Sequence, residues 1–142
     1  MTVRKSTGQT TTGQELKVGS LAELRWQKRI VIIFSDENNQ MAARQENQLL
    51  AVREGLEDRD VIVLRFRGTA VDVLFGSIRV NFEANALRQS LSGPETGEFA
   101  MILVGKDGTE KLRAKTPVPA EELFALIDNM PMRQAETRHA DE

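Results

Sequence analysis

The segment FAMILVGKDGTEKLRAKTPVPAEELFALIDNMPMRQ, residues 99–134, decides the fold, because an apolar run, a tight-turn signal and an amphipathic stretch follow one another in it. The apolar run Phe99–Val104 predicts a buried strand, and Asp107 and Gly108 suit a tight turn from which Thr109–Arg113 returns antiparallel. Pro119 suits the first position of a final helix. The buried stripe of that helix is expected at Ala120, Leu123, Phe124 and Ile127.

A βαβ unit is expected upstream of this segment. The run Arg29–Ser35 is apolar and β-branched on both faces, which is typical of a central strand covered by helices on each side. Polar residues at 36–39 can cap a following helix, and Val61–Phe66 supplies a second strand. The buried face of that helix is expected to contain Ala42, Gln45, Leu49, Val52 and Leu56.

Two shorter elements are expected between this unit and the C-terminal segment. Residues 68–80 are too apolar for a solvated loop, and a turn at residues 76–77 can close a small extra hairpin over 71–80. Asn81 can cap a helix that ends before the breaker Ser92-Gly93-Pro94.

The order βαβ, helix, ββα predicts an α/β fold of the thioredoxin-like class, with a mixed four-stranded central sheet and helices on both faces; other α/β sandwiches remain open. Residues 20–134 are expected to form this single domain. Residues 1–19 are interpreted as a disordered or expression-derived arm, and residues 135–142 as a charged disordered tail. Ser20 and Glu23 have the spacing of a capping box for a short helical turn, after which Trp26 is expected to seal one edge of the core.

Composition limits the classes of function. The chain of 142 residues suits one domain, and its formal net charge of -2 gives no general attraction to nucleic acid or to anionic lipid. Aromatic residues make up 5% of the chain, which argues against a nucleic-acid surface built on base stacking. No cysteine is present, which excludes thiol oxidoreductase or peroxiredoxin activity and cysteine-ligated metals. With His139 as the only histidine and no cysteine, a transition-metal site lacks its usual ligands, and only a carboxylate site for Mg²⁺ or Ca²⁺ stays open. No metal residue is assigned, and no cofactor is expected.

Six segments carry a resemblance to one family. They are Trp26–Arg29, Glu57–Asp60, Leu87-Arg88, Gly105–Gly108, Lys111–Arg113 and Leu126–Arg133. In these segments the chain is similar to the thioredoxin-like domain of unknown function found in many bacteria. That domain also resembles the repeated module of secreted animal proteins that include equarin and the sushi-repeat protein. The resemblance covers about Leu21 to Gln134 and implies a thioredoxin-like fold, for which an oxidoreductase-like activity has been proposed within the family.

The turn after the first strand is where the resemblance implies any activity, because thioredoxin-like proteins carry their cysteines there. The candidate binding residues at this position are Ser35, Asp36, Glu37, Asn38, Arg65 and Arg67. The carboxylates could act as acid and base or hold a divalent cation, and the arginines could bind a small anion. Helix capping alone explains the same carboxylates, and Ser35 has no histidine to activate it. The cis-proline of the fold would fall near Glu98, where the nearest proline is Pro94. No catalytic residue is assigned.

The distinctive residues of the C-terminal third are expected at the other end of the sheet, because the third strand of this fold runs antiparallel to the first. Arg133 is expected to pair with Asp107 or Asp128, while methionines fill gaps in the core. The expected structural clamp comprises Lys106, Asp107, Gly108, Asp128, Met130, Pro131, Met132 and Arg133. A ligand site built from the same residues is the alternative.

The sequence therefore predicts a thioredoxin-like domain without redox activity that serves as a binding or scaffolding module, with a protein partner favoured over a small anion. The alternative is a cysteine-free enzyme, or a protein that binds a small anion or divalent cation, at the turn after the first strand. Self-association through the edge strand Thr109–Arg113 is a third hypothesis, so the protein is expected to be a monomer or a weak homodimer. Neither nucleic acid nor a membrane is expected as a partner. A cytoplasmic location is expected from the absence of a leader, or a periplasmic one if a leader has been removed.

Overall fold

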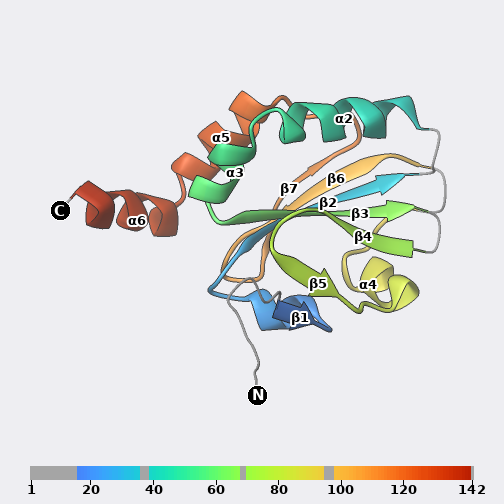
Figure 1. The fold of residues 1–142 in the computed structure, drawn as a ribbon. Helices are drawn as coiled ribbons and strands as arrows, with labels where there is room; N and C mark the ends of the chain where they lie inside the picture. Colours follow the sequence, from blue (N-terminus) through green and yellow to red (C-terminus); the bar gives the residue numbers. More distant parts are fainter. Residues whose placement is uncertain (1–15, 36–38, 68–69, 95–97, 142) are drawn as a thin grey trace, which may run out of the picture.

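The protein is described by a computed structural model over residues 16–35, 39–67, 70–94 and 98–141. Its centre is a mixed five-stranded sheet in the order β4-β3-β2-β6-β7 (Figure 1). The strands are β2 (Arg29–Ser35), β3 (Val61–Arg67), β4 (Ala70–Phe75), β6 (Ala100–Val104) and β7 (Glu110–Ala114). β2 runs parallel to β3 and antiparallel to β6. The predicted α/β class and the central position of the first predicted strand are confirmed.

Helices cover both faces of the sheet, as predicted (Figure 1). One face carries α2 (Gln40–Leu50), α3 (Arg53–Asp58) and α5 (Ala120–Asp128), and the other carries α4 (Ala84–Ser90). On the α4 side lie a parallel pair of β1 (Leu16–Val18) and β5 (Ile78–Val80) and the 3-10 helix η1 (Leu21–Leu24). The last helix, α6 (Pro131–Asp141), extends beyond the sheet.

The central position of β2 follows from its burial on both faces. All seven of its residues are buried. Ile30, Ile32 and Phe34 belong to the core cluster on the α4 side, whereas Val31 and Ile33 belong to the cluster beneath α2, α3 and α5. Because successive side chains of a strand alternate between its faces, a strand that is apolar at every position contributes to two cores at once.

The segment 71–80 forms two strands, but they do not pair with each other, so the extra hairpin expected there was wrong. β4 pairs antiparallel with β3, which gives the sheet five strands and not the expected four. β5 pairs with β1 instead. The physical reason is that Val71 and Val73 of β4 pack against the α4-side core, so β4 both buries apolar surface and covers what would be an open edge of β3.

Both ends of the domain depart from the expected arm and tail. Leu16–Val18 fall within the expected arm but form β1, where Val18 is fully buried. Residues 135–141 were expected as a disordered tail but continue helix α6. The polar composition of this helix resembles that of a disordered tail, which is why the prediction failed. The helix is held by Glu136, whose partners Arg29 and Lys106 lie far away in the sequence.

Trp26 does not seal the core, since it is 62% exposed. Its backbone has a φ of 71°, in the left-handed region that bulky residues rarely adopt. Its backbone N–H donates to the carbonyl oxygen of Lys106 at 2.6 Å, which ties the start of β2 to the turn between β6 and β7. Leu24 of η1 takes the buried position, with 1% exposure.

Helix boundaries differ from expectation in two places. The single helix expected between the first two strands is divided at residues 51–52 into α2 and α3. α4 begins at Ala84 and is capped by Glu83, whose oxygens accept from the N–H groups of Asn85 and Ala86, and not by Asn81. Within the described ranges, none of the helices has the length and apolar character needed to cross a membrane.

Candidate functional site

The turn after β2 lies mostly beyond what the structure describes. Asp36, Glu37 and Asn38 fall outside the described residues, whereas Ser35 ends β2 and is buried. The N-terminus of α2 is capped by Asn39, whose Oδ1 accepts from the N–H groups of Met41 at 2.9 Å and Ala42 at 3.1 Å.

The two arginines proposed for this turn, Arg65 and Arg67, differ in their contacts. Arg67 ends β3 in register with Ser35, so the sheet brings their backbones together. Arg65 is committed elsewhere: its NH1 lies 2.9 Å from Oε1 of Glu46, and its Nε lies 3.9 Å from Oδ2 of Asp72. Arg65 therefore offers this turn no unpaired positive charge.

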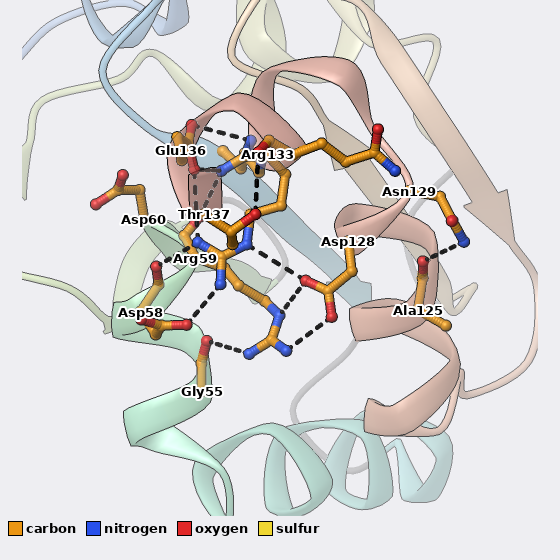
Figure 2. Close-up of polar contacts among 12 residues, drawn as sticks. Gly55, Asp58, Arg59, Asp60, Ala125, Asp128, Asn129, Arg133, Glu136 and Thr137 are labelled. Atoms are coloured by element: carbon orange, nitrogen blue, oxygen red, sulfur yellow. Dashed lines mark hydrogen bonds and ion pairs between the residues drawn. The ribbon is translucent and has the colours of Figure 1, made fainter. Parts of the chain in front are cut away.

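A cluster of paired charges occupies the opposite end of the sheet (Figure 2). Its four basic and four acidic side chains come from the start of β2, the end of α3 and the residues after it, the β6–β7 turn, α5 and α6. This ionic cluster consists of Arg29, Arg59, Lys106 and Arg133 with Asp58, Asp60, Asp128 and Glu136. Three of the basic residues are buried, with exposures of 1% for Arg29, 8% for Lys106 and 7% for Arg133.

Glu136 receives hydrogen bonds from two of these buried cations. Arg29 donates NH1 to Oε1 and NH2 to Oε2, both at 3.2 Å, and Lys106 Nζ donates to Oε2 at 2.7 Å. Lys106 also donates to Oδ2 of Asp60 at 2.8 Å. Burial opposes the ionisation of Glu136, but the hydrogen bonds and charges of Lys106 and Arg29 outweigh it, so the pKa of Glu136 is lowered.

Arg133 and Arg59 share the carboxylate of Asp128 (Figure 2). Arg133 also donates to Oδ2 of Asp58 at 2.6 Å and to its backbone carbonyl at 3.0 Å. Arg59 donates Nε and NH2 to the two oxygens of Asp128, both at 2.9 Å, and its guanidinium lies 4.1 Å from the centre of the Phe124 ring. The hydrogen bond from Arg59 is the main reason that the pKa of Asp128 is lowered.

Asp107 is not a partner of Arg133, although the sequence left that pairing open. Its Oδ1 accepts from the backbone N–H of Thr109 at 3.0 Å, and its Oδ2 lies 2.9 Å from Nζ of Lys111. The pKa of Asp107 is lowered to about 2, first by the Thr109 N–H and then by Lys111. Asp107 therefore stabilises the turn locally, outside the ionic cluster.

The remaining members of the expected clamp are dispersed. Met130 packs against the core beneath α5, Pro131 begins α6, and Met132 is 37% exposed and does not fill the core. Gly108 lies in the β6–β7 turn with a φ of 85°.

Each carboxylate of the ionic cluster faces a cation among the described residues, so its charges are balanced within the protein. Among the described residues, no group of three or more His, Asp or Glu side chains is arranged to hold a metal ion. The sequence analysis missed five of its members: Arg29, Asp58, Arg59, Asp60 and Glu136. All but Glu136 lie in segments that carry the family resemblance, which was the available signal.

A pocket of about 470 Å³ lies at the same end of the sheet, on the α4 side. Its apolar lining includes Ile30, Leu87 and Val104 of the core, and η1, α4 and the start of the β6–β7 turn form its walls. The charged side chains that line it are Arg25, Lys28 and Glu83. Sequence reasoning did not identify this pocket, because its lining comes from short elements separated along the chain.

Arg25 stands out among these charged residues, since no side chain in the described ranges pairs with it. A Cβ at Gly108 would lie 2.8 Å from Nε and 3.2 Å from NH2 of Arg25, so the guanidinium lies directly against the glycine backbone. Lys28 lies 3.8 Å from Oδ1 of Asp60, and Glu83 already caps α4. The pocket therefore combines an apolar interior with one cation, Arg25, that has no acidic partner among the described residues.

Comparison with known sequences gives a family match and a distant named relative. A family model described as "Domain of unknown function (DUF4174)" matches residues 20–136. Coiled-coil domain-containing protein 80 of Danio rerio is 27% identical over 132 residues, which cover 82% of this chain and 15% of that protein. The chain therefore spans a small part of the length of this relative.

Solved structures with a similar fold include a thioredoxin peroxidase, a peroxiredoxin and a disulfide oxidoreductase. Thioredoxin peroxidase I of Plasmodium yoelii is 14% identical with a TM-score of 0.52, covering 85% of this chain and 79% of that chain. The reduced 2-Cys peroxiredoxin of Plasmodium vivax is 11% identical with a TM-score of 0.55, covering 81% and 72%. A secreted disulfide oxidoreductase of Mycobacterium tuberculosis is 17% identical with a TM-score of 0.51, covering 77% and 86%. At these identities the likeness shows a thioredoxin-like fold and nothing of the chemistry.

Proposed function

The chain belongs to the family described as "Domain of unknown function (DUF4174)", and from its geometry we propose that it is a thioredoxin-like binding module without redox activity. Its ligand site is the pocket beside Arg25. The chain has no cysteine with which to form or reduce a disulfide.

The observation that carries this proposal is the contrast between the pocket and the other charged regions. In the ionic cluster and around Arg65, positive charges are matched by carboxylates within the protein. No described carboxylate is paired with Arg25, which lines a concave surface whose interior is largely apolar. Concave apolar pockets with a few convergent polar groups are the usual form of a small-molecule site.

The ionic cluster supports this pocket from the side. The side chain of Lys106 is held by Asp60 and Glu136, while its carbonyl oxygen accepts the N–H of Trp26, the residue that follows Arg25. The buried charges of the cluster thus fix the backbone that carries the unmatched cation. We assign the cluster this structural role and assign it no ligand.

The relationship to coiled-coil domain-containing protein 80 supports a modular role. The match covers 82% of this chain but 15% of that protein, so a related unit occurs within a much longer chain. A unit that recurs in a larger protein is suited to binding or scaffolding.

The alternative site at the turn after β2 has weaker support. Arg65, one of its two proposed cations, is paired with Glu46 and Asp72. An anion bound there would compete with carboxylates that are already in place.

The proposal is tested by mapping ligand binding on the backbone amides of the ¹⁵N-labelled protein by NMR. A fragment set of acids, amines and neutral apolar compounds should perturb Ala86, Leu87 and Gly108, and leave Ser35 unaffected. Ala86→Phe, which fills the pocket from α4, should abolish these shifts, whereas Ala43→Phe on the exposed side of α2 should not. Perturbations confined to Ser35 and Arg67, or none from any compound, would refute the proposal.

A further inference from the structure

We infer that the pocket binds a monovalent organic anion with an apolar body, such as a medium-chain carboxylate, and that Arg25 binds the carboxylate. This inference rests on the proposed function and adds the class of ligand. It follows from the apolar lining, the balance of charge and the way in which Arg25 is held.

The lining of the pocket suits an apolar body. Ile30, Leu87 and Val104 are core residues with exposures of 2%, 7% and 4%, so the floor of the pocket is a small opening onto the α4-side core. Phe82 and Leu91 add further apolar surface to the lining. A hydrocarbon chain placed there removes apolar surface from water on both sides, which is favourable.

The charges of the lining favour a ligand with a single negative charge. Lys28 lies close to Asp60, and the oxygens of Glu83 accept N–H groups of α4, each at 3.1 Å. Arg25 is left as the cation without a partner among the described residues. A guanidinium presents two parallel N–H groups that match the two oxygens of one carboxylate.

The backbone on both sides of Arg25 is held in place. The N–H of Arg25 donates to the carbonyl of Ala22 at 3.2 Å, and the N–H of Trp26 donates to the carbonyl of Lys106 at 2.6 Å. Trp26 is held at a φ of 71°, in the left-handed region that is unfavourable for a bulky residue and that is concentrated at functional sites.

The guanidinium itself lies against Gly108, a residue whose backbone conformation favours glycine. Gly108 has a φ of 85°, and a Cβ there would come within 2.8 Å of Nε of Arg25. The backbone that carries Arg25 is therefore fixed before a ligand arrives, which reduces the entropy lost on binding.

The experiment is a calorimetric titration of the full chain with octanoate, 1-octanol and octylamine, which share one apolar body and differ in charge. We expect octanoate to bind about tenfold or more tightly than octanol, because a hydrogen bond to a charged group adds that much, and octylamine to bind most weakly. Arg25→Gln should reduce the affinity for octanoate to that for octanol, and Arg25→Lys should give an intermediate value. Arg44→Gln, a matched change on exposed α2, should leave both affinities unchanged.

The outcomes separate this inference from the proposed function. Equal binding of octanoate and octanol, with no effect of Arg25→Gln, would overturn the anionic ligand class but leave the pocket as a binding site. Octanoate binding that survives Ala86→Phe would place the anion outside the pocket and also overturn the inference. If no probe binds while fragments of another class still perturb Ala86 and Leu87, the ligand class is wrong and the binding function remains. If nothing perturbs the pocket, both fail.

Discussion

Nζ of Lys106 and Oε2 of Glu136 meet at 2.7 Å, although 30 positions separate the two residues in the sequence. Lys106 follows β6, and Glu136 lies in the last helix, α6. The carbonyl of Lys106 also accepts the N–H of Trp26. One residue thus joins the C-terminal helix, the β6–β7 turn and the start of β2, beside the pocket that contains Arg25.

Glu136→Gln should destabilise the protein by about 2–4 kcal/mol, because it leaves Arg29 and Lys106 buried with much of their compensating charge removed. Urea unfolding followed by circular dichroism measures the change. Glu57→Gln, a matched substitution at an exposed position, should change stability by less than about 0.5 kcal/mol. Equal effects of the two substitutions would show that the ion pairs of Glu136 contribute nothing.

Truncation of the C-terminus should reveal a sharp boundary at Glu136. A chain that ends after Ala135 should lose about as much stability as Glu136→Gln, since both remove the same carboxylate partner of Arg29 and Lys106. A chain that ends after Arg138 keeps this carboxylate and should unfold close to the urea midpoint of the full chain. Indistinguishable midpoints for the two truncations would support the disordered tail inferred from sequence.

Asp107→Asn should lower stability at neutral pH by about 1 kcal/mol or less, since the carboxylate is partly exposed and Asn can still accept the Thr109 N–H. The folded pKa of about 2 lies below the ordinary value of 3.8, so the contribution of the charge is fully present above about pH 4. It is lost as the pH falls toward 2 and the carboxylate is protonated in the folded state. Urea midpoints of both proteins between pH 7 and pH 2 should therefore converge at the acid end; a constant difference would contradict the assignment.

Trp26→Gly should change stability by less than about 1 kcal/mol, because relief of the left-handed backbone offsets the greater entropy of glycine in the unfolded chain. A tryptophan that sealed the core would cost about 3–5 kcal/mol on truncation. Since Trp26 is the only tryptophan, the fluorescence of the native protein reports on it directly. The native emission maximum should lie close to that of the urea-unfolded chain; a strongly blue-shifted native maximum would mean that Trp26 is buried.

Gly108→Ala should destabilise the protein by about 1–2 kcal/mol through its positive φ, and should also weaken octanoate binding by displacing Arg25. Gly76→Ala is the control, because Gly76 also has a positive φ, of 133°, but does not line the pocket, so it should lower stability without changing octanoate binding. Denaturation and calorimetry on the same samples separate the two effects. Full octanoate affinity in Gly108→Ala would show that contact with this glycine does not position Arg25.

Much of the secondary structure could be predicted, because it depends on patterns within a few residues. The first strand was expected at Arg29–Ser35 and lies there, and the strand expected at Phe99–Val104 spans Ala100–Val104. The strand that pairs with β4 could not be predicted from such local patterns. An apolar strand followed by a glycine turn is compatible with pairing to either neighbour, and burial of Val71 and Val73 beside β3 decides between them.

The candidate site was much less predictable than the fold. Asp128 was one of two partners expected for Arg133 and is in contact with it, but Asp58 was not foreseen. Exposed and buried charges look the same in a sequence, since pairing depends on distances between segments that local patterns do not report.

The sequence by itself determined the α/β class, the central buried strand and the absence of cysteine, because hydrophobic periodicity and composition are properties of the chain alone. Only the tertiary structure decided which charges are neutralised. It buries Arg29 and Lys106 against Glu136 and places Arg25 against Gly108, where no side chain of the described ranges pairs with it. The physical reason is that electrostatic pairing and pocket shape depend on side chains brought together from distant segments, and these contacts exist only after the core has packed.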